Sequence, residues 1–180
     1  MPNKSRGFTL IEVLIVLTVA GILLAVVVPS FRTVIERSRV STEVNAFVSD
    51  LQFARSEAIK QGIPVSLCAS TNGTTCSTEN TWHKGWLVFS NVTGTGTMQS
   101  GDVILRTRPA FKAGDTLVAD PAITALTYNR DGFALLTGNA SGATLLSLRT
   151  VPTVSSITRC ISMNRIGYQT IYKSGQGGCT

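Results

Sequence analysis

The N-terminal third of the chain has a hydrophobic pattern that predicts one long helix with two different halves. From Phe8 to Val28 the chain reads FTLIEVLIVLTVAGILLAVVV and holds a single ionisable residue, Glu12. A helix of this length, at about 1.5 Å per residue, matches a hydrocarbon core of about 30 Å. This run is therefore predicted to span a membrane.

Farther along, apolar positions recur at spacings of three and four, which predicts an amphipathic continuation of the same helix. Pro29 removes one backbone hydrogen bond and is expected to bend the helix without ending it. Gly62 and Pro64 supply the stop, so the helix is predicted from about residue 8 to residue 61. The apolar positions are Val40, Val44, Phe47, Val48, Leu51, Ala54 and Ala58, and the charged residues Arg37, Glu43, Asp50, Arg55, Glu57 and Lys60 are expected largely on the other faces.

After Gly62 the chain changes to short β-prone runs separated by Gly, Asn, Asp, Ser and Thr, which predicts an antiparallel sheet or sandwich. The stretch 70–101 is expected to be mostly surface loop around one strand at 85–90. The predicted strands lie within residues 63–68, 85–90, 102–108, 122–129, 132–138, 143–149, 156–163 and 167–173. The fold class is therefore α+β, with a long N-terminal helix packed on a small antiparallel β-sandwich head.

These patterns divide the chain into three parts. Residues 1–7 form a short basic leader, 8–62 the long helix and 63–180 the β-rich head. Within the helix, 8–30 is the transmembrane half and 31–62 the amphipathic half. The basic leader favours a cytoplasmic N-terminus and a C-terminus outside. A secretory signal has its cleavage site after the apolar stretch, whereas Gly7 stands before it, so the apolar run is expected to survive processing.

The overall charge is basic, with 16 Lys and Arg against 10 Asp and Glu. Acidic partners such as nucleic acid or anionic lipid therefore have to be considered. Asp131 is the last acidic side chain, and the basic residues after it are Arg149, Arg159, Arg165 and Lys173. The C-terminal part of the chain is thus purely basic.

The four cysteines allow three pairings, and sequence proximity favours Cys68 with Cys76 and Cys160 with Cys179. Neither pair has the two-residue spacing of a zinc or redox motif, and His83 is the only histidine. We therefore expect two disulfides and neither a metal nor a cofactor. Disulfides place the head in an oxidising space such as the bacterial periplasm or the cell exterior.

Gly7 followed by FTLIEVLIVL resembles the type IV prepilin signature. The resemblance implies that a prepilin peptidase in the membrane cuts after Gly7 and methylates the new amino group of Phe8. It also implies that Glu12 pairs with that amino group, in the same or a neighbouring subunit, and so sets the stagger of the filament. A carboxylate inside a bilayer is costly unless it is paired, which fits this role. The alternative is a capping box, because Thr9 and Glu12 have its spacing.

The head resembles the minor pilins and pseudopilins of the GspH/FimT/FimU family across most of residues 51–134. The matching pieces are LQFARSEAIKQG, VSLCAS, TNGTTC, WHKGWLVF, SGDVILR and YNRDGFA. The resemblance implies a pilin-like fold, other pilins or pseudopilins as partners, and a single pass through the bacterial inner membrane with the head in the periplasm before assembly into a filament. The implied function is a structural or priming subunit of a type IV pilus. A pseudopilin of a type II secretion system is the alternative.

A third reading is a DNA-binding minor pilin for natural transformation. In some FimT-type proteins the resemblance implies DNA capture by a Gly-Arg-x-Arg motif near the C-terminus. Here the corresponding stretch, 164–169, reads NRIGYQ, so only Arg165 can be carried over, with Arg159 and Lys173 as nearby charges. Strand alternation would have to place the three on one face. The competing interpretation is a solvated basic edge that discourages strand-to-strand aggregation.

Trp82 and Trp86 flank His83 and Lys84, a pattern that could stack on nucleic acid bases. Tryptophan in a small β-rich head is more often part of the core, and we expect that here. The sequence offers no nucleophile, base and orienting group that could be brought together. We therefore expect that the protein is not an enzyme.

Overall fold

The computed structural model describes residues 7–137 and 143–180, without the side chains of residues 26–30 and Thr137. The predicted leader therefore lies outside the described residues, apart from Gly7. One compact unit ends at Arg39 and the second spans Val40–Thr180.

A single helix, α1 (Leu10–Gln61), forms the N-terminal part of the fold. It continues through Pro29, as predicted. Thr9 caps its start, since Thr9 Oγ1 accepts a hydrogen bond from the backbone N–H of Glu12 at 3.3 Å. Its end is set by Gly62, which has a φ of 68° and donates its N–H to the Ala58 carbonyl.

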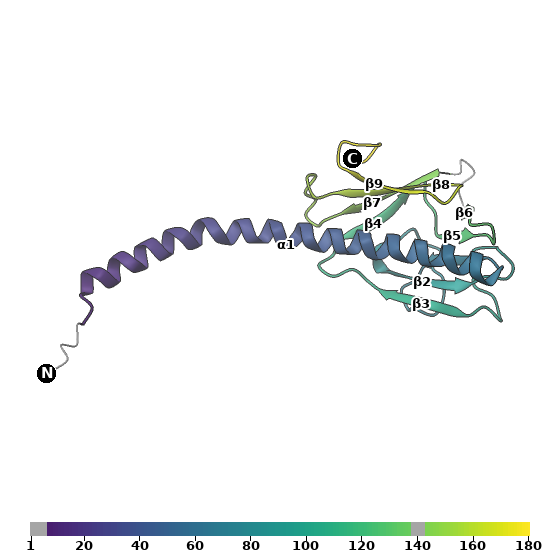
Figure 1. Ribbon diagram of the computed structural model, residues 1–180, viewed down its shortest axis with the longest axis horizontal. Helices are drawn as coiled ribbons and strands as arrows, with labels where there is room; N and C mark the ends of the chain where they lie inside the picture. Colours follow the sequence, from purple (N-terminus) through teal and green to yellow (C-terminus); the bar gives the residue numbers. More distant parts are fainter. Residues whose placement is uncertain (1–6, 138–142) are drawn as a thin grey trace. The chain divides into compact units, whose positions relative to one another are not determined.

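The head contains two antiparallel sheets (Figure 1). The first has the strand order β3-β2-β1-β5-β6, with β1 (Val65–Ala69), β2 (Gly85–Ser90), β3 (Ile104–Pro109), β5 (Ala125–Tyr128) and β6 (Ala134–Thr137). The second has the order β4-β7-β8-β9, with β4 (Thr116–Asp120), β7 (Ala143–Arg149), β8 (Arg159–Asn164) and β9 (Gln169–Lys173). The α+β class with antiparallel sheets is confirmed.

The strand prediction missed β4, which pairs with β7 from Thr116↔Arg149 to Asp120↔Leu145. This strand is only five residues long, and polar Thr116 and Asp120 at its ends leave an apolar run of three residues. The stretch 70–101 also departs from a simple surface loop, because the short 3₁₀ helix η1 (Trp82–Lys84) places Trp82 in the core.

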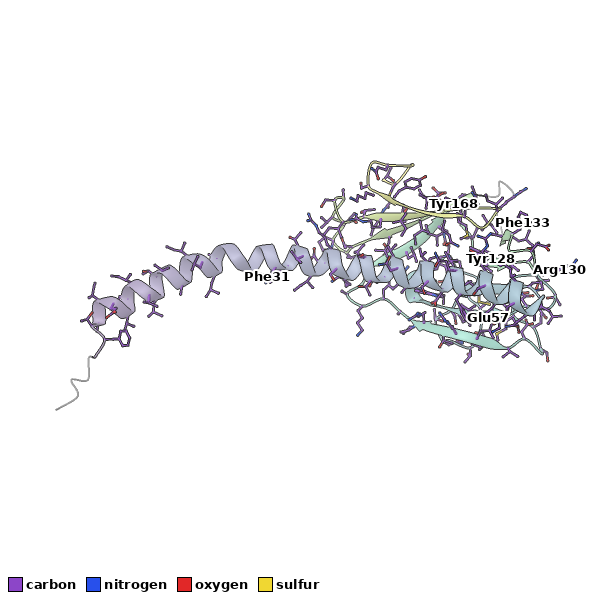
Figure 2. All side chains as sticks on the ribbon, viewed as in Figure 1. Phe31, Glu57, Tyr128, Arg130, Phe133 and Tyr168 are labelled. Carbon is purple, nitrogen blue, oxygen red and sulfur yellow. A yellow bond between two sulfur atoms is a disulfide. The ribbon has the colours of Figure 1, made fainter. Side chains whose placement is uncertain are left out.

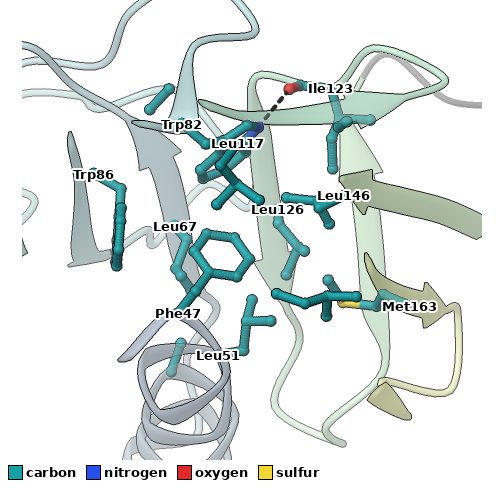
Figure 3. Packing of buried hydrophobic residues seen from close by; sticks show 14 of the residues in the cluster. Phe47, Leu51, Leu67, Trp82, Trp86, Leu117, Ile123, Leu126, Leu146 and Met163 are labelled. Atoms are coloured by element: carbon teal, nitrogen blue, oxygen red, sulfur yellow. Dashed lines mark hydrogen bonds between the residues drawn. The ribbon is translucent and has the colours of Figure 1, made fainter. Parts of the chain in front are cut away.

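The second half of α1 and the two sheets enclose one core (Figure 3). Phe47 and Leu51 are completely buried. The Phe47 ring makes edge-to-face contacts with Trp82 and Trp86, with centroids 5.5 and 5.2 Å apart. The predicted apolar face of the helix is therefore confirmed, except that Val48 is only partly buried. Its buried members are Val40, Val44, Phe47, Leu51, Ala54 and Ala58.

Strand β2 is buried along its whole length because both of its faces are covered. Trp86 and Val88 belong to the main core. Leu87 and Phe89 pack on the other face in a second cluster with Cys68, against partly buried Met98. The Thr- and Ser-rich loops of 70–101 thus cover the outer face of the first sheet.

Asp50 was expected on the polar side of the helix, and this prediction is wrong, because its side chain is completely buried. The carboxylate accepts hydrogen bonds from Trp86 Nε1 at 3.1 Å, Arg106 Nη1 at 3.1 Å and Arg108 Nε at 2.7 Å. The Arg106 guanidinium also lies 3.5 Å from the centroid of the Phe53 ring. The hydrogen bond that Arg108 donates to Asp50 raises the pKa of Arg108. This charged cluster fastens α1 to β2 and to the edge strand β3.

We predict that Asp50→Asn lowers the free energy of unfolding by about 3 kcal/mol, since it removes the buried charge that two arginines share. Breaking a buried ion pair costs about 3 to 5 kcal/mol. We take the low end of this range because the side chains of Arg106 and Arg108 are 39 and 40% exposed and can be partly hydrated. Urea unfolding followed by the fluorescence of the buried tryptophans measures the change. Asp120→Asn, at an exposed carboxylate, is the matched control and should stay within about 0.5 kcal/mol of the parent. Equal midpoints for the two variants would contradict this role for Asp50.

Candidate functional site

The first half of α1 exposes its apolar side chains on every side (Figure 2). From Phe8, which directly precedes the helix, to Leu24, the exposed fraction of the large apolar side chains ranges from 48% at Val13 to 82% at Phe8. An apolar surface this continuous marks a binding surface rather than ordinary solvent exposure. Its described large members are Phe8, Leu10, Ile11, Val13, Leu14, Ile15, Val16, Leu17, Val19, Ile22, Leu23 and Leu24.

The last three residues of the predicted membrane span, Phe8–Val28, belong to the stretch 26–30, whose side chains the structure does not describe. Among the described residues, no helix combines the length and the apolarity needed to cross a membrane.

Gly7 and Phe8 precede the helix, and both are exposed. The peptide bond between them is therefore accessible to a peptidase. Nothing lies within 4 Å of where a Cβ on Gly7 would stand, so the glycine leaves open space on this side of the bond.

Glu12 lies in the first turn of α1, and its side chain is exposed. Thr9 supplies one half of the capping box through its hydroxyl. The reciprocal bond, from the Thr9 N–H to the Glu12 carboxylate, is not found between the residues that the structure describes. The helix start is thus capped by Thr9, and the carboxylate faces outward.

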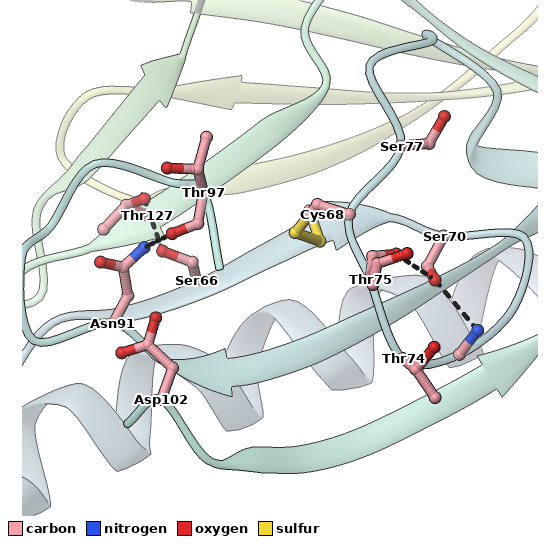
Figure 4. The surroundings of a disulfide bond; sticks show 12 residues. Ser66, Cys68, Ser70, Thr74, Thr75, Ser77, Asn91, Thr97, Asp102 and Thr127 are labelled. Carbon is pink, nitrogen blue, oxygen red and sulfur yellow. Dashed lines mark hydrogen bonds between the residues drawn. A yellow bond between two sulfur atoms is a disulfide. The ribbon is translucent and has the colours of Figure 1, made fainter. Parts of the chain in front are cut away.

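The cysteines join Cys68 to Cys76 and Cys160 to Cys179, with Cα atoms 5.5 and 5.6 Å apart. This is the pairing that sequence proximity favours. The first bridge fixes the loop after β1, where Ser70 Oγ also donates to the Thr75 carbonyl at 2.6 Å (Figure 4). The second ties β8 to the C-terminal residues. Both are structural bridges that hold loops against the sheets.

The three basic residues predicted for DNA binding do not form one cluster. Arg159 lies opposite Lys173 across the β8–β9 pair. Arg165 follows the far end of β8, about 20 Å from Arg159 at roughly 3.3 Å per residue. The Arg159 guanidinium donates to the carbonyls of Ser156, Ile157 and Thr158. Nothing in this placement builds a continuous cationic track.

The two tryptophans are core residues, as expected. Trp82 donates its Nε1–H to the Ile123 carbonyl at 3.0 Å, and Trp86 reaches Asp50. His83 Nδ1 lies 3.3 Å from the Leu117 carbonyl. In 7–137 and 143–180, no three His, Cys, Asp or Glu side chains stand close enough to hold a metal ion.

Sequence reasoning missed a corner of the head at which three segments meet. Arg55 on α1 donates to the carbonyls of Ile166 and Gly167, both at 3.2 Å, in the turn between β8 and β9. Arg55 was expected on a polar face of the helix, and its guanidinium reaches this turn. Glu57 instead accepts hydrogen bonds from Gln61 and Lys60 on its own helix, and the bond from Gln61 lowers its pKa.

Two glycines allow this corner to close. Gly167 has a φ of 75°, and a Cβ there would lie 2.8 Å from the Gly132 carbonyl oxygen. Gly132, with a φ of 82°, belongs to the turn between β5 and β6. The backbone of Ala134 also donates to the Arg165 carbonyl at 2.8 Å. The close approach of the two turns therefore requires residues without a side chain.

Comparison with known proteins identifies the family. The chain matches the family described as type II transport protein GspH over residues 43–167, more than two thirds of its length. It also matches the prokaryotic N-terminal methylation motif over residues 2–28. The chain belongs to the GspH family. Together the two matches make it a type IV pilin-like protein, as the sequence resemblance implied.

Solved structures support the fold of this GspH-family protein. Two crystal forms of the type IV minor pilin FimU from Pseudomonas aeruginosa PAO1 are similar to it, each at 23% sequence identity. The P21 form has a TM-score of 0.57 and covers 81% of this chain and 95% of FimU. The P65 form has a TM-score of 0.54 and covers 77% and 94%. At this identity the likeness shows the pilin fold.

The GspH region includes Asp50, its two arginines and the corner around Arg55. It ends at Gly167, so β9 and Cys179 lie beyond it. Tyr128, under the corner, is buried and accepts a hydrogen bond from Gln169 Nε2 at 2.7 Å. Burial raises the pKa of the Tyr128 hydroxyl to about 12.

We predict that Tyr128 makes the GspH head lose stability between about pH 10 and pH 12. In that window the tyrosine ionises in the unfolded chain while it stays protonated in the folded one, so the unfolded state binds fewer protons and stability falls as the pH rises. Tyr128→Phe should reduce this loss by about 2 to 3 kcal/mol, as measured by urea unfolding at several pH values. Tyr168→Phe, at an exposed tyrosine, is the matched control. A slope equally steep in Tyr128→Phe would contradict the prediction.

Proposed function

We propose that this protein is a minor pilin of a type IV pilus, a structural or priming subunit whose N-terminal helix joins a bundle of similar helices. The exposed apolar surface from Phe8, just before α1, to Leu24 within it is the observation that carries the proposal. Burying half of these side chains against neighbouring helices would contribute on the order of 10 kcal/mol. This is enough to hold a filament together without covalent links.

Before assembly, the protein is held in the bacterial inner membrane with its head in the periplasm. The prepilin peptidase removes residues 1–7 and methylates the amino group of Phe8. The accessible bond after Gly7 and the match to the N-terminal methylation motif support this step. The two disulfides support a periplasmic head, since such bonds persist in oxidising compartments.

Glu12 sets the position of the subunit in the filament. Its carboxylate would enter an apolar bundle, where an unpaired charge is expensive. The cationic amino group of Phe8 on a neighbouring subunit neutralises it at one stagger only. The outward-facing carboxylate at the capped start of α1 supports this role.

A type II secretion pseudopilin is the second candidate, because the matched family is described as a type II transport protein. The helix, the processing site and the pairing of Glu12 serve both machines equally well. The two candidates differ in the neighbours of the head and in the cellular process that depends on it.

We predict that Glu12→Gln lowers the share of this protein in filaments sheared from cells by about tenfold or more, since a loss of 1.4 kcal/mol is already tenfold. Glutamine keeps the size of the side chain and can serve equally well in a capping box, so the change removes only the charge. Glu36→Gln, elsewhere on α1, is the control. Quantitative immunoblotting measures the filament fraction, and normal incorporation of Glu12→Gln would favour a capping role.

A deletion strain separates the two machines. For a pilus subunit we expect loss of surface filaments, counted by electron microscopy, with unchanged amounts of secreted proteins in the medium. The full chain supplied in trans should restore the filaments. The opposite pattern, with normal filaments and a loss of secreted proteins, would select the pseudopilin.

A further inference from the structure

The corner around Arg55 carries an exposed apolar surface that the assembly of α1 leaves unused. Four large apolar side chains there are 50 to 62% exposed. We call them the end patch: Ile59, Phe133, Ile166 and Tyr168. Figure 2 shows Phe133 and Tyr168 at the same end of the head, with Arg130 close by.

The contacts of the two glycines place these side chains together. A Cβ on Gly132 would lie 3.0 Å from Ile59 Cδ1, so the residue before Phe133 touches the last turns of α1. Gly167 stands between Ile166 and Tyr168 and lies against Gly132. The end patch is therefore one surface built from α1 and two turns.

The backbone beneath the patch is held in place before any partner binds. Arg55 is bonded to the carbonyls of Ile166 and Gly167. Asn129 Oδ1 accepts the backbone N–H groups of Asp131 and Phe133 at 3.0 and 2.9 Å. A preformed surface loses little conformational entropy on binding, which favours recognition.

A pocket of about 310 Å³ opens within the patch. Ile59 and Tyr168 form its apolar walls, and Arg55, Gln52, Ser56 and Gln169 supply polar groups. Small-molecule sites have volumes of about 300 to 1,000 Å³, so this pocket is at the lower end of that range. Its size suits a single side chain of a partner.

The charge around the patch selects the partner. Arg130 and Arg165 are exposed beside it, Arg55 lines the pocket, and Asp131 is the one acidic residue in the two turns. A second copy of this chain that docked through its own end patch would bring the same cations face to face. Tyr, Phe and Arg are the residues enriched at protein interfaces. The surface therefore suits a different protein with an acidic face.

A nucleic acid fits this surface less well. Two of the four exposed apolar side chains are isoleucines, which offer no ring for a base to stack on. Arg159 and Lys173 lie at the other end of the β8–β9 pair, so phosphates would find no continuous track of cations.

We propose that the end patch docks an acidic face of a neighbouring, different filament subunit, and that one Asp or Glu side chain of that neighbour enters the pocket beside Tyr168 toward Arg55. This inference rests on the proposed function, since the neighbour belongs to the same filament. The apolar side chains supply contact area, and the arginines set the orientation and exclude basic partners.

Site-specific photocrosslinking in living cells tests the proposal on the full chain. p-Benzoylphenylalanine replaces Tyr168, which is exposed and tolerates a larger ring, and in a control strain it replaces exposed Val103. Crosslinked peptides are identified by mass spectrometry. We expect Tyr168 to crosslink to an acid-rich segment of another filament subunit, and Val103 not to reach that segment.

Charge reversal provides the second readout. Arg130→Glu with Arg165→Glu should lower the yield of this crosslink about tenfold, whereas Lys112→Glu, an exposed lysine outside the patch, should leave it unchanged. Reversal of the crosslinked acids on the partner should restore part of the yield.

Other outcomes overturn the proposal in distinguishable ways. A crosslink to nucleic acid, to a second copy of this chain or to a segment without acids contradicts the docking partner, and so does a yield that survives the double reversal. If the protein is present in sheared filaments and Tyr168 gives no crosslink, only the docking proposal fails. If the protein is absent from the filaments, the proposed function fails with it.

Discussion

The core of the head depends on the second half of α1, which supplies the side chains that both sheets cover. Phe47 and Leu51 are completely buried there, and the Phe47 ring is in edge-to-face contact with Trp82 of η1 and Trp86 of β2. Hydrophobic contact by itself has little directionality. The buried carboxylate of Asp50 adds direction, because three donors from β2 and β3 must meet it at once. The rotation of the helix about its own axis is fixed by this cluster.

Because α1 is one continuous helix, it links the core of the head to an exposed apolar segment. The same unbroken helix carries buried apolar residues after Val40 and exposed ones before Leu24. The exposed residues need an apolar environment of their own, and under the proposed function a membrane followed by a bundle of similar helices supplies it in turn. In the proposal the head then determines which neighbours a subunit accepts, and the end patch is the surface that makes this contact.

Features set by local sequence were predicted correctly. The helix, its apolar face apart from Val48, the eight predicted strand runs and the two cysteine pairs all follow from spacing, because periodicity and loop length are local properties. The family, too, followed from short motifs. Two of these runs, 122–129 and 156–163, begin as strands only at Ala125 and Arg159.

Features set by distant packing were not predictable in this way. Asp50 lies at the edge of the apolar face, three residues after Phe47 and four before Ala54, but a carboxylate is normally expected in solvent. Only Arg106 and Arg108 on β3 compensate for the burial of its charge. The separation of Arg165 from Arg159 and Lys173 depends on where β8 ends. The corner around Arg55 depends on two turns 35 residues apart, from Gly132 to Gly167, that meet only in the folded head.

The most direct test of the central claim is the N-terminal mass of this protein in filaments sheared from cells and purified. The account predicts a chain that begins at Phe8 and carries one methyl group on its amino nitrogen, present in smaller amount than the major subunit. A chain that keeps residues 1–7, or that is missing from the filaments of cells that make it, would contradict the account.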